Sequence, residues 1–320
     1  MKVLLTAILF LYVFVCATGQ SIPAEEENIP FMVTFGNEAP KDWGDDDYCQ
    51  IFFIIIPETY SSSFYVRIFD PDCGGLFDEK REDFNTKTRF SLYGGSNCYS
   101  EPDARKPNPS GNYKSGNLLA SKIFGENNQY DNNWYTFGPL NPSEGEYVKS
   151  YKGHIFKIIA EGISGNDGNL YKYFISSAEN KNIVVEGCNA FTYEYTFRLS
   201  DNAKHISHIY PFIDKDVISI KVHNFDWDKD GYIRIISNAK NGLLCKTSNE
   251  GDWASSIFNV KEEEKNSTFD IQLIKPDNNA LKNNNGVLYI TNQYNETLPF
   301  YTTPIGGVPK YIYKIKVQRK

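Results

Sequence analysis

The sequence has little of what most catalytic and metal sites are built from. Of its 320 residues only 4 are histidine and 2 are methionine, and no CxxC pair occurs. Zinc ribbons and thioredoxin-like redox sites therefore have no support. The HExxH, GxSxG, GxGxxG and phosphate-loop motifs are also missing. The sequence thus points to no particular reaction and favours a protein without catalytic activity.

A basic surface is missing as well, because the net charge is -7. The nearest thing to a basic patch is the group Lys314, Lys316, Arg319 and Lys320, which a solvent-facing strand explains. Nucleic-acid binding depends on clustered positive charge. We therefore expect no nucleic acid among the partners.

Long hydrophobic runs are absent except at the start of the chain. There, Lys2 precedes an apolar stretch that ends at the small residues Ala17 and Gly19. This pattern predicts a signal peptide over residues 1–19, with a retained anchor or a lipid-modified Cys16 as alternatives. Removal of the signal implies a secreted, cell-surface or periplasmic protein. No transmembrane segment is predicted after it, since the next apolar run, residues 51–56, is too short to span a bilayer.

Cysteine is too sparse for a small disulfide-stapled fold. Outside the predicted signal the chain has five: Cys49, Cys73, Cys98, Cys188 and Cys245. The number is odd, so at least one thiol should be free or should bridge two chains. One or two disulfides within the chain stay open.

Aromatic residues are abundant: they make up 15% of the chain, with 22 tyrosines and 22 phenylalanines. They lie in short runs between clusters of Gly, Asn, Asp and Pro, and no sustained helical stripe occurs. The pattern predicts an all-β protein of two antiparallel β-sandwich domains in tandem, C2-like or jelly-roll-like. We place them at 20–200, with a long irregular segment at 99–133, and at 201–320. Alternation predicts one strand over 191–199 and a last strand over 311–317.

A short internal similarity suggests that the two domains arose by duplication. Residues 64–69 (FYVRIF) resemble residues 231–236 (GYIRII), and each stretch follows a β-rich run. A glycine-containing turn follows each of them. Repeats of this kind are the signature of duplicated units, so the sequence predicts an internal duplication.

Three alternate carboxylates form the main candidate metal site. Asp226, Asp228 and Asp230 precede Gly231, and Tyr232 would add a backbone carbonyl, as in the first half of a calcium loop. Ser237 stands where an EF-hand has its bidentate glutamate, and no flanking helices are predicted. The stretch is therefore not an EF-hand. Calcium could still bind here with ligands from a second loop; otherwise Asp230-Gly231 is a hairpin turn.

Two weaker candidates accompany it. Asp70 and Asp72, with Asp78 and Glu79 close behind, could form a second cation site or a turn that stabilises itself. Trp227 lies among loop carboxylates and could stack on a sugar, although a tryptophan is more often part of a core.

The segments 65–72 (YVRIFDPD), 145–147 (GEY) and 167–171 (DGNLY) resemble uncharacterised secreted all-β proteins of bacteria. They are also distantly similar to C2-type and pre-peptidase C-terminal β-sandwich modules. The resemblance implies binding to calcium, a glycan, a membrane surface or another protein, and not catalysis. We therefore predict an exported binding or adhesion protein whose partner is an extracellular glycan or protein. Calcium could stabilise it as a structural ion. A secreted hydrolase with an unrecognised carboxylate pair and a structural envelope or matrix component are the alternatives.

Overall fold

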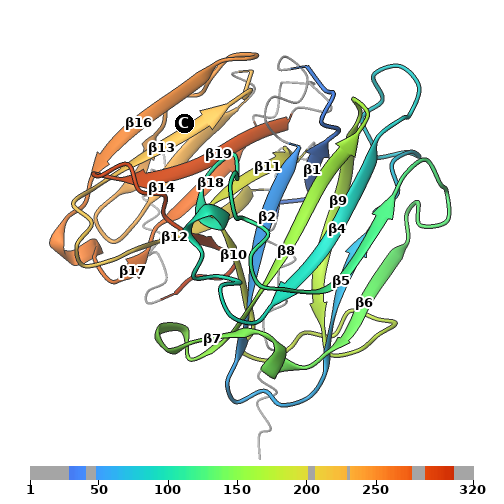
Figure 1. The fold of residues 1–320 in the computed structure, drawn as a ribbon. Coiled ribbons are helices and arrows are strands. Elements are labelled where there is room, and N and C mark those ends of the chain that lie inside the picture. The colour runs from blue at the N-terminus through green and yellow to red at the C-terminus, as the bar shows by residue number, and fades with distance from the viewer. Residues whose placement is uncertain (1–28, 41–47, 201–205, 229–230, 276–284, 306–320) are drawn as a thin grey trace, which may run out of the picture.

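A computed structural model describes residues 29–40, 48–200, 206–228, 231–275 and 285–305. These residues form two large antiparallel sheets and four short 3-10 helices, η1 (Pro102–Arg105), η2 (Pro142–Glu144), η3 (Lys149–Tyr151) and η4 (Glu262–Glu264) (Figure 1). The predicted all-β class is confirmed. Within the described ranges no helix is long and apolar enough to cross a membrane.

The first sheet has eight strands. Their order is β16 (Trp253–Asn259), β13 (Ser219–Phe225), β19 (Asn285–Asn292), β11 (Glu194–Arg198), β1 (Phe31–Phe35), β9 (Gly168–Ser176), β3 (Phe64–Phe69) and β6 (Trp134–Leu140).

The second sheet has twelve strands. Ten follow the order β15 (Asn241–Leu244), β14 (Tyr232–Ile236), β18 (Asp270–Ile274), β12 (Ile206–Ile213), β20 (Phe300–Tyr301), β10 (Asn189–Thr192), β2 (Cys49–Pro57), β8 (Gly153–Ser164), β4 (Lys87–Gly94) and β5 (Asn117–Phe124). Two more strands pair at its side, β17 (Ser267–Thr268) with β12 and β7 (Glu146–Val148) with β8.

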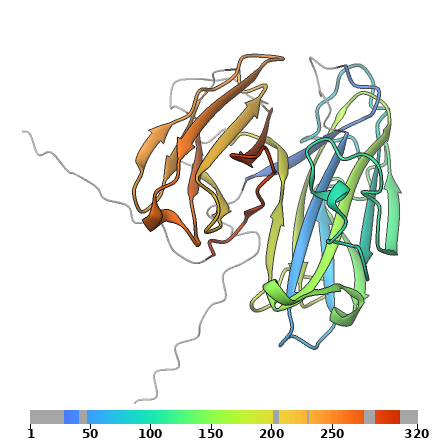
Figure 2. The same cartoon turned by 60° about the vertical axis from the view of Figure 1, so that its left-hand side comes forward.

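The strands gather into two sandwiches, as predicted. We call β1–β10 the N-terminal lobe and β12–β19 the C-terminal lobe; Figure 2 shows them side by side. Both sheets continue from one lobe to the other. Strand β11 pairs with β1 and with β19, and β20 pairs with β10 and with β12. A domain boundary at residue 200 stays a prediction.

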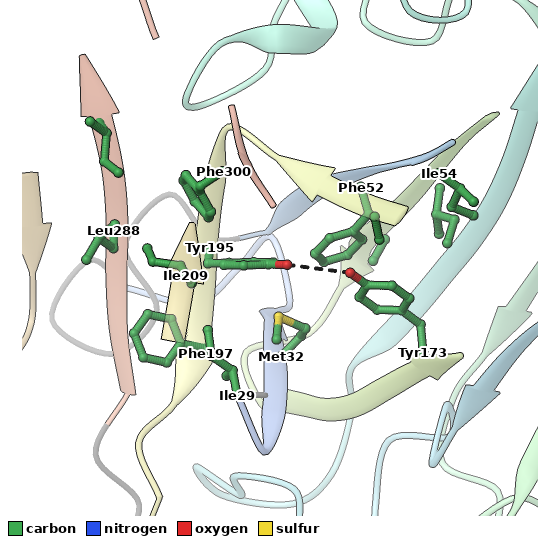
Figure 3. Close-up of a cluster of buried hydrophobic side chains, with 14 of the residues drawn as sticks. Ile29, Met32, Phe52, Ile54, Tyr173, Tyr195, Phe197, Ile209, Leu288 and Phe300 are labelled. Carbon is green, nitrogen blue, oxygen red and sulfur yellow. Dashed lines mark hydrogen bonds between the residues drawn. The ribbon is translucent and has the colours of Figure 1, made fainter. Parts of the chain in front are cut away.

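The core fills the space between the two sheets because alternate residues of each strand point inward. It is continuous across the lobes: Phe52 and Tyr173 of the N-terminal lobe belong to the same buried cluster as Ile209 and Leu288 of the C-terminal lobe (Figure 3). The hydroxyls of Tyr173 and Tyr195 lie 3.5 Å apart within it. This shared core joins the two sandwiches into one packed body.

Two predicted local structures are wrong. The alternating run 191–199 is not one strand, because its first part lies in β10 of the second sheet and its last part in β11 of the first. The chain crosses between the sheets there, and Thr192 Oγ1 donates to the Ile51 carbonyl at 2.6 Å. The Asp230-Gly231 stretch is not a hairpin either: β13 and β14 belong to different sheets, so this loop also crosses between them.

The segment 99–133 is more regular than predicted, since it contains η1 and β5. Its first part lies over an aromatic cluster on the outer side of the second sheet. Lys157, fully buried in β8, holds it there by donating to the carbonyls of Tyr113 (2.6 Å) and Ser115 (2.9 Å). Burial lowers the pKa of Lys157 to about 8.

All five cysteines outside the predicted signal are buried free thiols, so the disulfides left open by the sequence do not form. Burial raises the pKa of Cys98 and of Cys245 to about 12, which keeps both protonated. The proposed duplication stays a prediction. Its two similar segments, β3 and β14, are each second from an edge, but they lie in different sheets.

Candidate metal centre

The loop after β13 shows only part of the main predicted site. Asp226 and Asp228 have positive φ angles of 54° and 55°. Asp226 Oδ1 accepts a hydrogen bond from the Gly251 N–H at 2.9 Å, and Asp228 is exposed. Tyr232 lies in β14, and Asp230 lies outside the described residues. Calcium binding at this loop stays a prediction.

Trp227, in the same loop, has a different role from the predicted one. Its side chain is fully buried, 6.2 Å from the Phe197 ring between ring centroids, and its backbone N–H donates to Ser248 Oγ at 2.9 Å. A buried indole cannot stack on a ligand that arrives from solvent. The prediction of a ligand-stacking residue is therefore corrected: Trp227 is a core residue.

The weaker predicted site is better formed. β3 ends at Phe69, and Asp70 turns the chain with a φ of 56°. The carboxylates of Asp70 and Asp72 are both buried and reach a second loop: Asp70 Oδ1 accepts from the Asn132 N–H at 2.9 Å, and Asp72 Oδ2 from the Tyr130 N–H at 2.7 Å. Asp70 and Asp72 thus tie the loop after β3 to the loop between β5 and β6.

Asp78 and Glu79, predicted to lie close by, differ from each other. Asp78 links its own loop to β9: one oxygen accepts from the Gly74 N–H of the same loop and the other from the Leu170 N–H of β9, both at 2.6 Å. Glu79 points elsewhere and forms an ion pair with Arg198. Only Asp78 therefore joins Asp70 and Asp72.

Sequence reasoning missed a fourth carboxylate, Asp131. A methyl group added to Gly75 (φ 80°) would lie 2.8 Å from Asp131 Oδ2, so this carboxylate faces the glycine backbone closely. Asp131 Oδ1 is buried and accepts no hydrogen bond from any described residue. Nothing in the polar sequence around Asp131 marks it, because its partners, residues 70–78, lie far from it in the chain.

Burial raises the pKa of three of these carboxyl groups, and the charges of neighbouring carboxylates add to the effect. Burial is the main cause for Asp70, whose pKa rises to about 6, and the charges of Asp131 and Asp72 add to it against the hydrogen bond from Asn132. Burial also raises the pKa of Asp72, with Asp131 contributing, and holds the pKa of Asp78 well above its usual value. Folding therefore disfavours the ionised form of these carboxyl groups.

The nearest cations do not form ion pairs with this cluster. Lys122 and Lys172 lower the pKa values of Asp72 and Asp70 through their charge, but their ammonium groups lie over aromatic rings, 4.2 Å from the Tyr135 centroid and 4.4 Å from that of Phe31. Within the part of the chain that the structure covers, Asp70, Asp72, Asp78 and Asp131 have no salt bridge. We call these four residues the aspartate cluster.

An open pocket of ≈ 500 Å³ lies beside the aspartate cluster. It is lined by Cys73, Gly74, Gly75, Phe84, Glu126, Asn127, Asn128 and Asp131. Carboxylate and amide oxygens of this kind are ligands for a hard cation such as Ca²⁺. As the side chains stand, no three His, Cys, Asp or Glu residues among those described are grouped closely enough to hold a metal ion. Binding would therefore require the carboxylates to draw together.

Comparison with known proteins gives no identity. No family model matches the chain, and no curated protein matches it. Among solved structures, one described as a "putative secreted protein" from Parabacteroides distasonis is similar over 78% of this chain and 75% of that chain, at 10% identity and a TM-score of 0.16. A similarity this low carries no argument about fold or function. The resemblance to C2-type modules stays a prediction.

Proposed function

We propose that the protein is an exported, non-catalytic binding protein of the cell surface or extracellular space, and that the aspartate cluster binds a calcium ion. Export rests on the leader over residues 1–19, which lies outside the described residues. The partner is an extracellular glycan or protein, as the sequence resemblance implies. The bound ion would stiffen the two loops that carry the cluster.

One observation carries the calcium proposal: four aspartates from two loops lie together without an ion pair, and one buried oxygen, Asp131 Oδ1, has no hydrogen-bond donor among the described residues. Ionised carboxylates that repel one another are costly unless a cation joins them. An all-oxygen donor set favours Ca²⁺ over Zn²⁺, which prefers nitrogen and sulfur. Extracellular calcium suits sites with dissociation constants of about 0.1–1 mM.

Calcium should raise the melting temperature at pH 7. With a dissociation constant of about 0.1–1 mM, about 10 mM Ca²⁺ would stabilise the fold by about 1.4–2.7 kcal/mol, or roughly 3–10 °C. Asp131→Asn should remove most of this shift, because it removes one charge without changing the size of the side chain. Differential scanning calorimetry with and without Ca²⁺ measures the effect.

Asp228→Asn is the matched control, since Asp228 is exposed in the loop that the sequence first suggested. If calcium binds the aspartate cluster, this variant keeps the full shift. A shift lost in Asp228→Asn and kept in Asp131→Asn would move the site to the loop after β13. No shift in the wild-type protein would exclude a calcium site that stabilises the fold.

Without calcium, the aspartate cluster should make the protein less stable as the pH rises from about 4 to about 6. The pKa of Asp70 is about 6 in the folded protein and 3.8 for an unperturbed aspartate, the value expected in the unfolded chain. As the pH rises, the unfolded chain therefore loses this proton first. Stability from this group is highest below the unfolded pKa and is lost as the pH rises through the folded one, by about 2 kcal/mol once solvent screening is allowed for.

Asp70→Asn isolates this contribution, and asparagine tolerates the positive φ of position 70. The free energy of unfolding, measured with urea between pH 4 and pH 7, should show that the variant gains stability relative to wild type as the pH rises. A constant difference across this range would contradict the raised pKa.

The hydrolase alternative has one observation in its favour, a carboxyl group whose pKa is raised into the range of a general acid. However, Asp70 and Asp72 do not line the open pocket. A substrate in the pocket would meet Asp131 and Glu126 instead. Turnover of polysaccharides or peptides that Glu126→Gln abolishes would replace the binding proposal with this one.

A further inference from the structure

Four strands form the outer edges of the two sheets, and three of them carry features that hinder pairing with another strand. β15 has only four residues and an irregular register with β14. β5 contains Lys122 and a register shift with β4, and β6 contains Pro139. Charges, proline, bulges and short length are the means by which proteins protect sheet edges. These three edges are therefore protected.

The fourth edge, β16, has no such feature. Its seven residues, WASSIFN, include no charge, proline or glycine, and its register with β13 is regular from Trp253 to Asn259. An exposed edge of this kind is a template for a further strand. As far as the described residues show, the eight-stranded sheet thus ends on an unprotected side.

The backbone of β16 offers a row of donors and acceptors. The Val260 N–H bonds to the Ile218 carbonyl and the Asp226 N–H to the Asp252 carbonyl, so the even-numbered residues bond to β13. The N–H and C=O groups of the odd-numbered residues therefore point away from the sheet. No described residue bonds to these outward groups of Trp253, Ser255, Ile257 and Asn259.

Apolar side chains accompany this edge. Trp253 is 46% exposed and Ile257 is 68% exposed. The edge strand of the other sheet, β15, adds Leu243 (48%) and Leu244 (65%). Both sheets of the C-terminal lobe therefore end in exposed apolar residues, which is typical of an interaction surface.

We propose that β16 pairs with β16 of a second copy of this chain, antiparallel and around a two-fold axis at Ser256. This register is the one that pairs all four outward-facing residues: Trp253 with the partner's Asn259, and Ser255 with the partner's Ile257. About eight hydrogen bonds join the copies, two for each bonded pair. Ile257 of each copy lies diagonally from the partner's Ile257, and this contact covers both exposed side chains.

Charge at the strand ends favours this partner. In this register the exposed Lys261, just after β16, comes near the exposed residues Glu250 and Asp252 just before β16 of the partner. The two-fold axis repeats the contact. Glu262, next to Lys261, is already neutralised by Lys265 at 2.8 Å. The uncharged strand also lets two acidic chains approach without repulsion along the ladder.

Analytical ultracentrifugation of the whole mature chain tests the proposal, with a dimer expected at about 100 µM. Ile257→Lys should weaken dimerisation at least about tenfold, because the two new charges meet at the two-fold axis. Ser255→Pro should do the same, since it removes an N–H that points out of the sheet and leaves the bonds to β13 intact. Thermal melting checks that both variants are folded.

The matched control is Ile123→Lys, which places the same charge at an exposed position of β5, 48% exposed on another edge. It should leave the dimer unchanged. A wild-type protein that stays monomeric at about 100 µM overturns the proposal. A dimer that survives both β16 variants also overturns it, as does a monomer whose β16 binds an added strand-forming peptide.

Discussion

Trp227→Ala should lower the free energy of unfolding far more than any substitution at the surface. The indole is fully buried, and it fills the space over Gly286, where an added methyl group would lie 3.2 Å from Trp227 Cε3. Removing a buried tryptophan leaves a cavity and loses contacts, at a cost of about 3–5 kcal/mol. Urea denaturation followed by circular dichroism measures it as a lower midpoint at an unchanged slope.

Tyr294→Ala provides the comparison, because that ring is 73% exposed and its loss should cost less than about 0.5 kcal/mol. The experiment also separates the two roles considered for Trp227. If Trp227 is a core residue, its replacement lowers stability and leaves calcium binding to the folded protein unchanged. A variant as stable as the wild type that fails to bind its partner would restore the ligand-stacking role.

Local pattern marks several strands of the N-terminal lobe. Aromatic and β-branched residues are concentrated in residues 31–35, 48–56, 63–69 and 88–94, and the structure has β1, β2, β3 and β4 there. A buried strand can be identified from its own residues, because hydrophobic and β-branched side chains are enriched in it. What the pattern does not record is the partner strand. This is why the run 191–199 and the loop after β13 were misread: each crosses between sheets, and alternation is the same on either sheet.

The candidate metal centre could be predicted only in half. Asp70, Asp72 and Asp78 lie close together in the sequence within one loop, so the sequence could identify them as a candidate site. Asp131 comes from another loop and meets them only because β3 and β6 are neighbours, with Phe69 opposite Trp134. The role of Trp227 was hidden for the same reason. It depends on Phe197 and Gly286, which other strands supply.

Breaking the buried ion pair between Lys240 and Glu264 is the second change with a large expected effect. Glu264 is fully buried and Lys240 nearly so, with Lys240 Nζ 2.7 and 2.6 Å from the two carboxylate oxygens. Burial alone would raise the pKa of Glu264, but hydrogen bonds from Lys240, Ser237 and the Lys261 N–H hold it below its usual value. Glu264→Gln leaves a buried ammonium without its counter-charge and should cost about 3–5 kcal/mol.

The position of this pair explains why the effect should reach the edge of the sheet. Lys240 lies in the turn between β14 and β15, and Glu264 lies in η4, which follows β16. The ion pair therefore connects the edge strand β15 to η4, the segment that follows the other edge strand, β16. Hydrogen exchange should show the amides of β15 opening first in Glu264→Gln, while those of β2 and β8 stay protected.

The pH dependence identifies the carboxylate as the cause. Because the pKa of Glu264 is lowered in the fold, its contribution is present above the unfolded value of about 4.5 and is lost as the pH falls through the folded one. The gap between wild type and Glu264→Gln should therefore narrow below about pH 4.5. A double variant, Lys240→Met with Glu264→Leu, removes both charges and should recover much of the lost stability. If it is as unstable as the single variant, packing rather than the unpaired ammonium is the cause.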